Sequence, residues 1–350
     1  MGDEAAAALA ADAGAGAGTL ADAGHDAGHD AGHDAGRPPP RLRGARFFDV
    51  PDAPIRDALA SEPFAAVERG GGGRSLGFRV TLADGTRAYF KPAQSFSGMN
   101  WRAEIAAYHL DRMLGLGRVA ASVGRRVAWA ELEDAAGDDP RVAELERDTD
   151  ELDGALIWWV PQRLRAAALP DGWERWLRLD DALAPVSPFQ PGGHYRSARE
   201  AFDAGAAARE VPPIPVADRE DRAAELSDLI VFDYLIHNGD RWSANHSNVR
   251  TLEHGGPLMF LDNAAGFTMR RARTGHLDAQ LASVQRFRRA TIEAARRLSV
   301  ARFAERLDAD PLGPLLDEEQ LAHLELRRAH LLAHVDGLIE RFGEERVLAW

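Results

Sequence analysis

The feature that most limits how this chain can fold is an apolar helix that leads directly into a polar loop. Residues 219–237 carry apolar side chains at the three- and four-residue spacing of a helix with a buried face. Residues 238–248 are mostly polar, and a short apolar segment then ends at Asp262. Hydrophobic residues make up 45% of the chain, enough for a packed globule. The pattern predicts polar side chains held at the end of a buried helix.

A β-hairpin is predicted in the first half of the chain. Apolar residues alternate over 78–82, and a strand returns over 88–91 after a turn-forming Asp-Gly pair. Strand alternation then places Tyr89 and Lys91 on the face opposite to Phe90.

A helix is predicted over 100–114, with Glu104 in its first turns among apolar neighbours. The remaining expected elements are strands over 64–68 and 121–130, an acidic loop over 131–153, a buried strand over 155–161, mixed helix and loop over 163–218, and mostly helix over 277–348.

Lysine occurs once in the chain, at Lys91, whereas the other 41 basic residues are arginine. Lysine offers a compact charge with three donors, while arginine is a broad planar fork. A single lysine in this background therefore indicates a site where arginine would not serve. The alternative is chance survival of one lysine codon in an arginine-biased sequence.

The polar loop and the segment after it contain the residue types that phosphoryl transfer requires. One carboxylate accepts the proton of the attacking hydroxyl, and a second carboxylate with an amide holds a metal on the phosphates. Asp240 and Asn245 have the spacing of the catalytic aspartate and metal-binding asparagine of kinases. Asp262, followed by Gly266 and Phe267, resembles the kinase metal-binding aspartate.

The upstream residues complete this set. Lys91 and Glu104 correspond to the lysine–glutamate pair that positions the phosphates. Gly71, Gly72 and Gly73 precede the hairpin, where backbone amides can approach phosphate closely.

Each of these residues also has an ordinary structural alternative. Asp240, Asn245, Asn248 and Asp262 could form turns, and Glu104 could pair with an arginine on a helix surface. The order of glycine loop, lysine, glutamate, aspartate, asparagine and aspartate along the chain favours the joint functional interpretation.

Parts of the chain resemble the four-jointed kinases, which belong with the Golgi casein kinase group of atypical secretory-pathway kinases. The resemblance covers roughly residues 70–340, and its most specific parts are the pairs Asp240-Arg241 and Asp262-Asn263. The best-matching segments are residues 232–241, 247–249 and 261–267. The Ala-, Gly- and Arg-rich composition suggests a bacterial relative of that group.

The resemblance implies an α+β fold of the bilobal protein-kinase type. We expect a small β-rich N-lobe over residues 45–162 and a larger, mainly helical C-lobe over residues 163–350.

The resemblance also implies roles for the site residues. Asp240 would be the catalytic base and Arg241 a second catalytic residue, and Asp262 would bind the metal together with Asn245 or Asn248. ATP with Mg²⁺ or Mn²⁺ would be the phosphate donor.

The acceptor is left open by the sequence. The group phosphorylates serine or threonine in proteins, or sugar hydroxyls, so we expect a Ser/Thr protein kinase. The alternatives are a small-molecule or glycan kinase and a pseudokinase scaffold that only binds nucleotide.

Residues 1–44 are predicted to be a disordered tail or linker, because Ala, Gly, Asp and a repeated Gly-His-Asp-Ala unit dominate them. The net charge of −13 argues against a nucleic-acid partner. With no cysteine, disulfides and thiolate sites are excluded. No signal or membrane span is visible, so we expect a cytoplasmic protein, or an exported or lipid-anchored one if the true start lies upstream.

Overall fold

The computed structural model describes residues 45–71, 74–95, 100–167, 169–183, 187–189, 216–242, 248–253, 255–267 and 274–350. The tail predicted over residues 1–44 lies outside the described residues. The described residues all lie within one compact unit, Pro39–Trp350. The division into two lobes after residue 162 stays a prediction.

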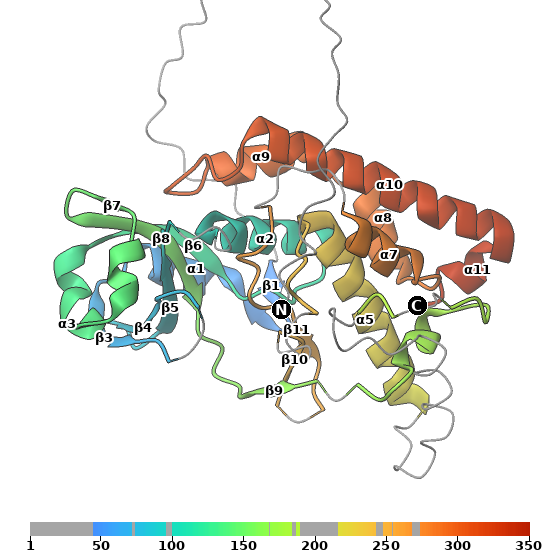
Figure 1. Cartoon of the computed structure of the whole chain (residues 1–350), viewed down its shortest axis with the longest axis horizontal. Helices are drawn as coiled ribbons and strands as arrows, with labels where there is room; N and C mark the ends of the chain where they lie inside the picture. Colours follow the sequence, from blue (N-terminus) through green and yellow to red (C-terminus); the bar gives the residue numbers. More distant parts are fainter. Residues whose placement is uncertain are drawn as a thin grey trace, which may run out of the picture. The chain divides into compact units, whose positions relative to one another are not determined.

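An antiparallel sheet forms the N-terminal part of the described chain (Figure 1). The predicted hairpin is confirmed, with Val80 opposite Ala88 across its two strands. In spatial order the strands are β3 (Phe64–Arg69), β4 (Phe78–Leu82), β5 (Arg87–Pro92), β8 (Glu151–Trp158) and β6 (Ser122–Ala128), and β7 (Arg147–Asp148) pairs with β8.

Strand β5 shows the predicted alternation. Ala88 and Phe90 are buried in the apolar core of the sheet. Tyr89 and Lys91 are only partly buried and line a cavity on the other face. Because successive side chains of a strand point to opposite faces, every second residue of β5 reaches the cavity.

Helix α2 (Trp101–Leu114) packs against this sheet, and its bounds confirm the predicted helix. The Asn100 side chain caps the first turn by accepting a hydrogen bond from the Arg102 backbone N at 3.1 Å. Gly115 ends the helix with a φ of 71°. Ahead of the sheet lie β1 (Arg46–Phe47), β2 (Val50–Pro51) and α1 (Asp52–Ser61).

The acidic span 131–153 is not simply the predicted loop. Leu132 and Ala136 are buried in the core of the sheet, while most of the acids are exposed, so composition alone was misleading here. Strand β8 also begins before residue 155, because Leu152 packs in the same core. The short helical segments are η1 (Trp129–Glu131), α3 (Glu133–Ala136) and η2 (Pro140–Glu144).

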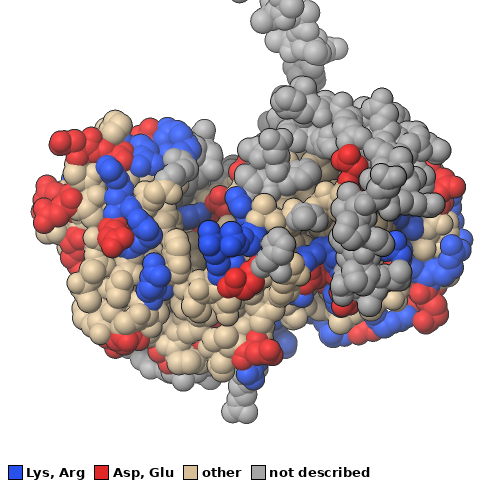
Figure 2. All heavy atoms as spheres, turned by 90° about the horizontal axis from the view of Figure 1, so that it is seen from below, with Lys and Arg blue, Asp and Glu red and all other residues tan. Residues whose placement is uncertain are grey.

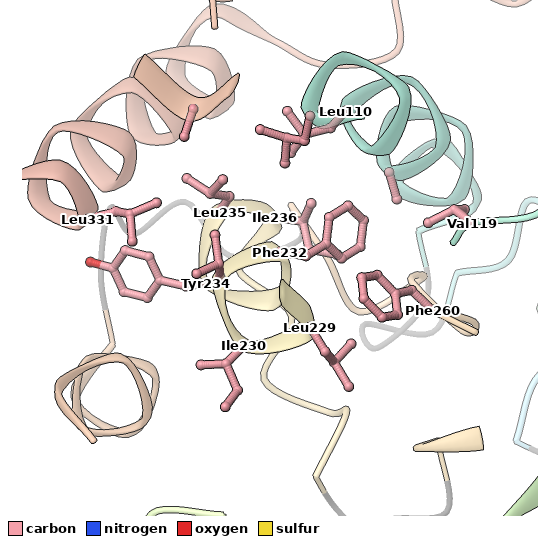
Figure 3. Close-up of a cluster of buried hydrophobic side chains, with 14 of the residues drawn as sticks. Leu110, Val119, Leu229, Ile230, Phe232, Tyr234, Leu235, Ile236, Phe260 and Leu331 are labelled. Carbon is pink, nitrogen blue, oxygen red and sulfur yellow. The ribbon is translucent and has the colours of Figure 1, made fainter. Parts of the chain in front are cut away.

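Helix α5 (Val216–Ile236) is the central helix of the C-terminal region and confirms the predicted apolar helix. Figure 3 shows Phe232 of α5 beside Phe260, and the two rings lie 5.4 Å apart. On another side of α5, Tyr234 lies near Leu331. The following helices are α7 (Gly275–Ala282), α8 (Arg289–Arg297), α9 (Val300–Asp308), α10 (Glu318–Phe342) and α11 (Glu344–Val347), as predicted for 277–348.

A small antiparallel sheet joins segments that are far apart in sequence. Its strands are β9 (Leu164–Ala166), β10 (Arg250–Leu252) and β11 (Leu258–Met259), with β10 in the middle. Strand β9 corrects the prediction of mixed helix and loop over 163–218, where the segment η3 (Trp173–Leu177) is also described. A three-residue strand has too little alternation to be recognised without its distant partner.

Charged side chains of both signs are interspersed on the described part of the face shown in Figure 2. Among the described residues, charged side chains form surface pairs, such as Arg126 with Asp153 at 2.7 Å. Within the described residues, no helix combines the length and the apolar character needed to cross a membrane.

Candidate active site

A cavity of about 770 Å³ lies between the N-terminal sheet, α2, the segment that joins β8 to β9, and the segments that follow α5 and β11. This volume is typical of small-molecule sites. Its lining includes Tyr89, Lys91, Glu104, residues 157–164, Asp240 and residues 259–265.

Lys91 lies between two carboxylates in the wall of this cavity. Its Nζ is 2.5 Å from Glu104 Oε1 and 2.8 Å from Asp262 Oδ1. Strand β5 supplies the lysine, α2 the glutamate, and the segment after β11 the aspartate. The fold thus brings together three of the residues singled out from the sequence.

The electrostatics of this site favour the charged forms of Lys91 and Asp262. Burial lowers the pKa of Lys91, but the charges of Glu104 and Asp262 outweigh that effect and leave the pKa raised. The Lys91 ammonium lowers the pKa of Asp262, against the opposing effect of burial. Lys91 and Asp262 are therefore held as an ion pair at neutral pH.

The loop that carries Asp262 has an unusual backbone. Asp262 has a φ of 57° and Phe267 a φ of 53°. Both angles lie in the left-handed region, which residues other than glycine rarely adopt. The Phe267 backbone N donates to the Ile236 carbonyl at 2.9 Å, and the Gln320 side-chain amide donates to the Phe267 carbonyl. Such strain persists where surrounding contacts hold it, and it is frequent at functional sites.

Asp240 lines the same cavity from the loop after α5. His237, with a φ of 61°, turns the chain out of the helix. The Asn238 side-chain oxygen accepts a hydrogen bond from the Asp240 backbone N at 3.1 Å. The Asn238 amide donates to the Asp262 carbonyl at 3.4 Å. Asn238 thereby links the two aspartates, a role that its sequence position alone did not reveal.

Arg241 does not present its guanidinium to the cavity. The side chain is fully buried and bonds Asp233 at 3.0 Å, Asn263 at 2.7 Å and the Leu261 carbonyl. Burial raises the pKa of Asp233 to about 6, although the Arg241 charge opposes this effect. Arg241 was predicted as a catalytic residue together with Asp240, but these contacts give it a positioning role.

The two candidate metal-binding asparagines differ in what the structure describes. Asn245 lies outside the described residues. Asn248 Nδ2 donates to Asp240 Oδ2 at 3.5 Å. Among the described residues no hydrogen bond reaches Asn248 Oδ1, so this oxygen can serve as a ligand.

Of the three glycines proposed to approach phosphate, Gly71 lines the cavity, while Gly72 and Gly73 lie outside the described residues. The flanking glycines have a different role. A Cβ added to Gly70 or Gly77 would lie 2.5 Å from the Tyr89 hydroxyl. The absence of side chains there makes room for the Tyr89 ring beside Lys91.

The oxygen donors at the cavity fit a hard divalent cation. Asp262 Oδ2 accepts no hydrogen bond from the described residues, and carboxylate and amide oxygens are the ligands that Mg²⁺ and Mn²⁺ prefer. The described chain contains no cluster of three His, Cys, Asp or Glu side chains suited to a metal. Phosphate oxygens and water would have to complete such a site.

Asn263, next to Asp262, was not predicted as a site residue. It is 1% exposed and hydrogen-bonded to Glu104 and Arg241. Two signals in the sequence pointed to it: its position after an apolar segment and its place in the Asp262-Asn263 pair of the family resemblance.

Comparison with known proteins identifies the family. A family model described as Golgi casein kinase, C-terminal, Fam20, matches residues 195–347, which include Asp240 and Asp262. This part of the chain belongs to the Fam20/four-jointed family of Golgi casein kinases. The recognition made from the sequence is therefore confirmed.

Individual relatives cover different shares of this chain. Human four-jointed box protein 1 is 30% identical over 238 residues, which are 63% of this chain and 47% of the relative. Human glycosaminoglycan xylosylkinase is 26% identical over 320 residues, 84% of this chain and 76% of the relative. The chain spans about half the length of the four-jointed relatives.

The fold comparison agrees with this assignment. The crystal structure of the Golgi casein kinase with Mn/ADP bound matches with a TM-score of 0.61 at 20% identity, covering 85% of this chain and 80% of that chain. This likeness confirms the predicted kinase-type α+β fold, with an N-terminal sheet and a helical C-terminal region.

Proposed function

We propose that this chain transfers the γ-phosphoryl group of ATP to a serine or threonine hydroxyl of a protein. One observation carries the proposal. Lys91, held by Glu104 and Asp262 at 2.5 and 2.8 Å, shares a single cavity with Asp240. The cavity thus combines a fixed cation for phosphates, a carboxylate for a metal and a second carboxylate for a proton.

Lys91 and Glu104 would act on the nucleotide. Lys91 Nζ donates to oxygens of the α- and β-phosphates, and Glu104 keeps the ammonium in place. Lys91 also contacts Asp262. When ATP binds, hydrogen bonds from Lys91 to phosphate oxygens would therefore replace part of that contact.

Asp262, with Asn248 or Asn245, would hold Mg²⁺ or Mn²⁺. When bound, such a cation neutralises charge on the phosphates during transfer. The structure of the Golgi casein kinase with Mn/ADP bound supports the choice of cation and nucleotide.

Asp240 would act on the acceptor. Its carboxylate takes the proton of the acceptor hydroxyl as the acceptor oxygen forms a bond to the γ-phosphorus. The bond between that phosphorus and the β–γ bridging oxygen breaks, and ADP leaves with the electron pair.

A protein acceptor is supported by relatives named extracellular serine/threonine protein kinases. A sugar hydroxyl is the second candidate, because the chain spans 76% of human glycosaminoglycan xylosylkinase but 54% of the human protein kinase. Some relatives are named pseudokinases. Against that alternative, Lys91, Glu104, Asp240 and Asp262 are all present.

The test is phosphate transfer from labelled ATP with Mn²⁺ or Mg²⁺ to two acceptors, dephosphorylated casein and a simple β-xyloside. We expect label in casein. Label in the xyloside alone would assign a sugar kinase. ADP binding without transfer to either acceptor, or to the chain itself, would contradict the kinase proposal and favour a pseudokinase.

A further inference from the structure

Asn263 is a buried residue that uses both amide donors and its oxygen acceptor. Its Oδ1 accepts a hydrogen bond from Arg241 Nη2 at 2.7 Å. Its Nδ2 donates to Glu104 Oε2 at 3.4 Å and to the Phe260 carbonyl at 3.1 Å. Its backbone N donates to Glu104 Oε1 at 3.1 Å. With 1% of the residue exposed, solvent is poorly placed to replace these bonds.

These contacts join two parts of the proposed active site. Glu104 also bonds Lys91 at 2.5 Å, and Arg241 also bonds Asp233 at 3.0 Å. A continuous series of polar contacts therefore runs from Lys91 on β5 to Asp233 on α5, with Asn263 in its middle.

The two neighbours of Asn263 make opposite demands. Glu104 requires a donor and Arg241 requires an acceptor, and an amide supplies both. An aspartate would keep the acceptor for Arg241 but place a second carboxylate against Glu104. An alanine would leave both partners buried without these bonds, which is costly for charged groups.

We propose that Asn263 is a positioning residue that couples the Lys91–Glu104 pair to the loop carrying Asp240. This inference rests on the proposed function. The side-chain amide of Asn263 makes all its hydrogen bonds to protein groups. Asn263 therefore acts through Glu104 and Arg241 rather than by binding the phosphates. Nucleotide binding and phosphate transfer should then change together when Asn263 is altered.

A double-mutant cycle on the full chain tests the coupling. ADP binding in the presence of Mn²⁺ is measured by calorimetry for the wild type, Asn263→Asp, Glu104→Gln and the double variant. We expect Asn263→Asp to weaken ADP binding roughly ten- to hundredfold, because the two carboxylates repel. The double variant should bind ADP more tightly than Asn263→Asp alone, since the glutamine amide can donate to the new carboxylate. Such a rescue is not expected from a general loss of packing.

Asn263→Ala is the second variant, and Gln285→Ala is its matched control. Gln285 is a buried amide away from the cavity, and its oxygen accepts a hydrogen bond from the Leu179 backbone N at 2.6 Å. Both variants should lower the thermal midpoint, but only Asn263→Ala should lower kcat for casein and affinity for ADP.

The outcomes separate this inference from the proposed function. If the wild type binds ADP normally but the effects of Asn263→Asp and Glu104→Gln on ADP binding simply add, the coupling is overturned. The proposed function would still stand in that case. If both alanine variants reduced ADP binding equally, Asn263 would be structural only. If the wild type bound no ADP, both proposals would fail.

Discussion

The Lys91 ammonium lies 2.8 Å from Asp262 Oδ1, the carboxylate that we propose as the metal ligand. The same ammonium is 2.5 Å from Glu104. One lysine is therefore shared between the carboxylate that orients it and the carboxylate that would receive the cation. Binding of the nucleotide and binding of the metal should depend on each other through this residue.

Replacing Lys91 with arginine tests whether charge alone is sufficient. The planar guanidinium cannot occupy the compact position between Glu104 and Asp262, so we expect kcat/KM for ATP to fall at least roughly a hundredfold. The reverse exchange on the surface, Arg126→Lys, is the control and should leave kcat/KM unchanged. Steady-state transfer to casein measures both variants. Full activity in Lys91→Arg would show that arginine serves equally well at this position and that the single lysine has survived by chance.

Replacing Asp262 with asparagine should raise the Mn²⁺ concentration for half-maximal activity by about tenfold or more. The variant loses an anionic ligand, while Glu104 still holds Lys91. A metal titration at saturating ATP measures the effect. Asp153→Asn, which removes a surface acid of β8, serves as the control. An unchanged titration curve for Asp262→Asn would assign the metal to other ligands.

Gly124 on β6 supports the contact between the sheet and the segment after α9. Its backbone N donates to the buried Asp310 carboxylate at 3.1 Å. An added Cβ would collide with that carboxylate and lie 2.9 Å from Leu312 Cβ. Gly124→Ala should therefore lower the free energy of unfolding by ~1–3 kcal/mol.

Denaturant unfolding measures this loss. Gly337→Ala is the control, because no atom lies within 4 Å of its added Cβ and alanine favours the helix. Equal stabilities for Gly124→Ala and the wild type would show that Asp310 can move away.

His109 on α2 should make the fold sensitive to acid. Burial, assisted by neighbouring arginines, lowers its pKa well below 6.5, and neither ring nitrogen has a hydrogen-bond partner among the described residues. As the pH falls below about 6.5, the unfolded state gains a proton that the folded state excludes. Stability is therefore lost as the pH falls, by up to ~1.4 kcal/mol per pH unit.

The substitution His109→Leu removes this titration. We expect thermal unfolding to show a smaller loss between pH 6.5 and pH 5 than in the wild type. The sign is specific, because a histidine with a raised pKa would gain stability over the same interval. An identical pH dependence for the two proteins would assign the acid sensitivity to other groups.

The sequence predicted those parts of the fold that depend on local periodicity. The alternation that places Lys91 on the face opposite to Phe90 is present in β5. The helical spacing predicted for α5 is present as well. Strand β9 was missed because its stability comes from pairing with β10, whose partner residues lie 84 to 88 positions later in the chain.

The site was predicted as a set of residues but not as a network. Lys91, Glu104 and Asp262 were each singled out by residue type and order, and they meet in space. The contacts of Asn263 and the burial of Arg241 could not be predicted, since both depend on how the two loops pack together.

The most direct test of the central claim compares the wild type with Asp240→Asn, using labelled ATP, Mn²⁺ and casein. The asparagine cannot accept the hydroxyl proton, so we expect kcat to fall by about 10²–10⁴-fold. ADP binding, measured on the same samples by calorimetry, should stay unchanged, because Lys91, Glu104 and Asp262 are intact. Transfer by Asp240→Asn at the wild-type rate would contradict the account.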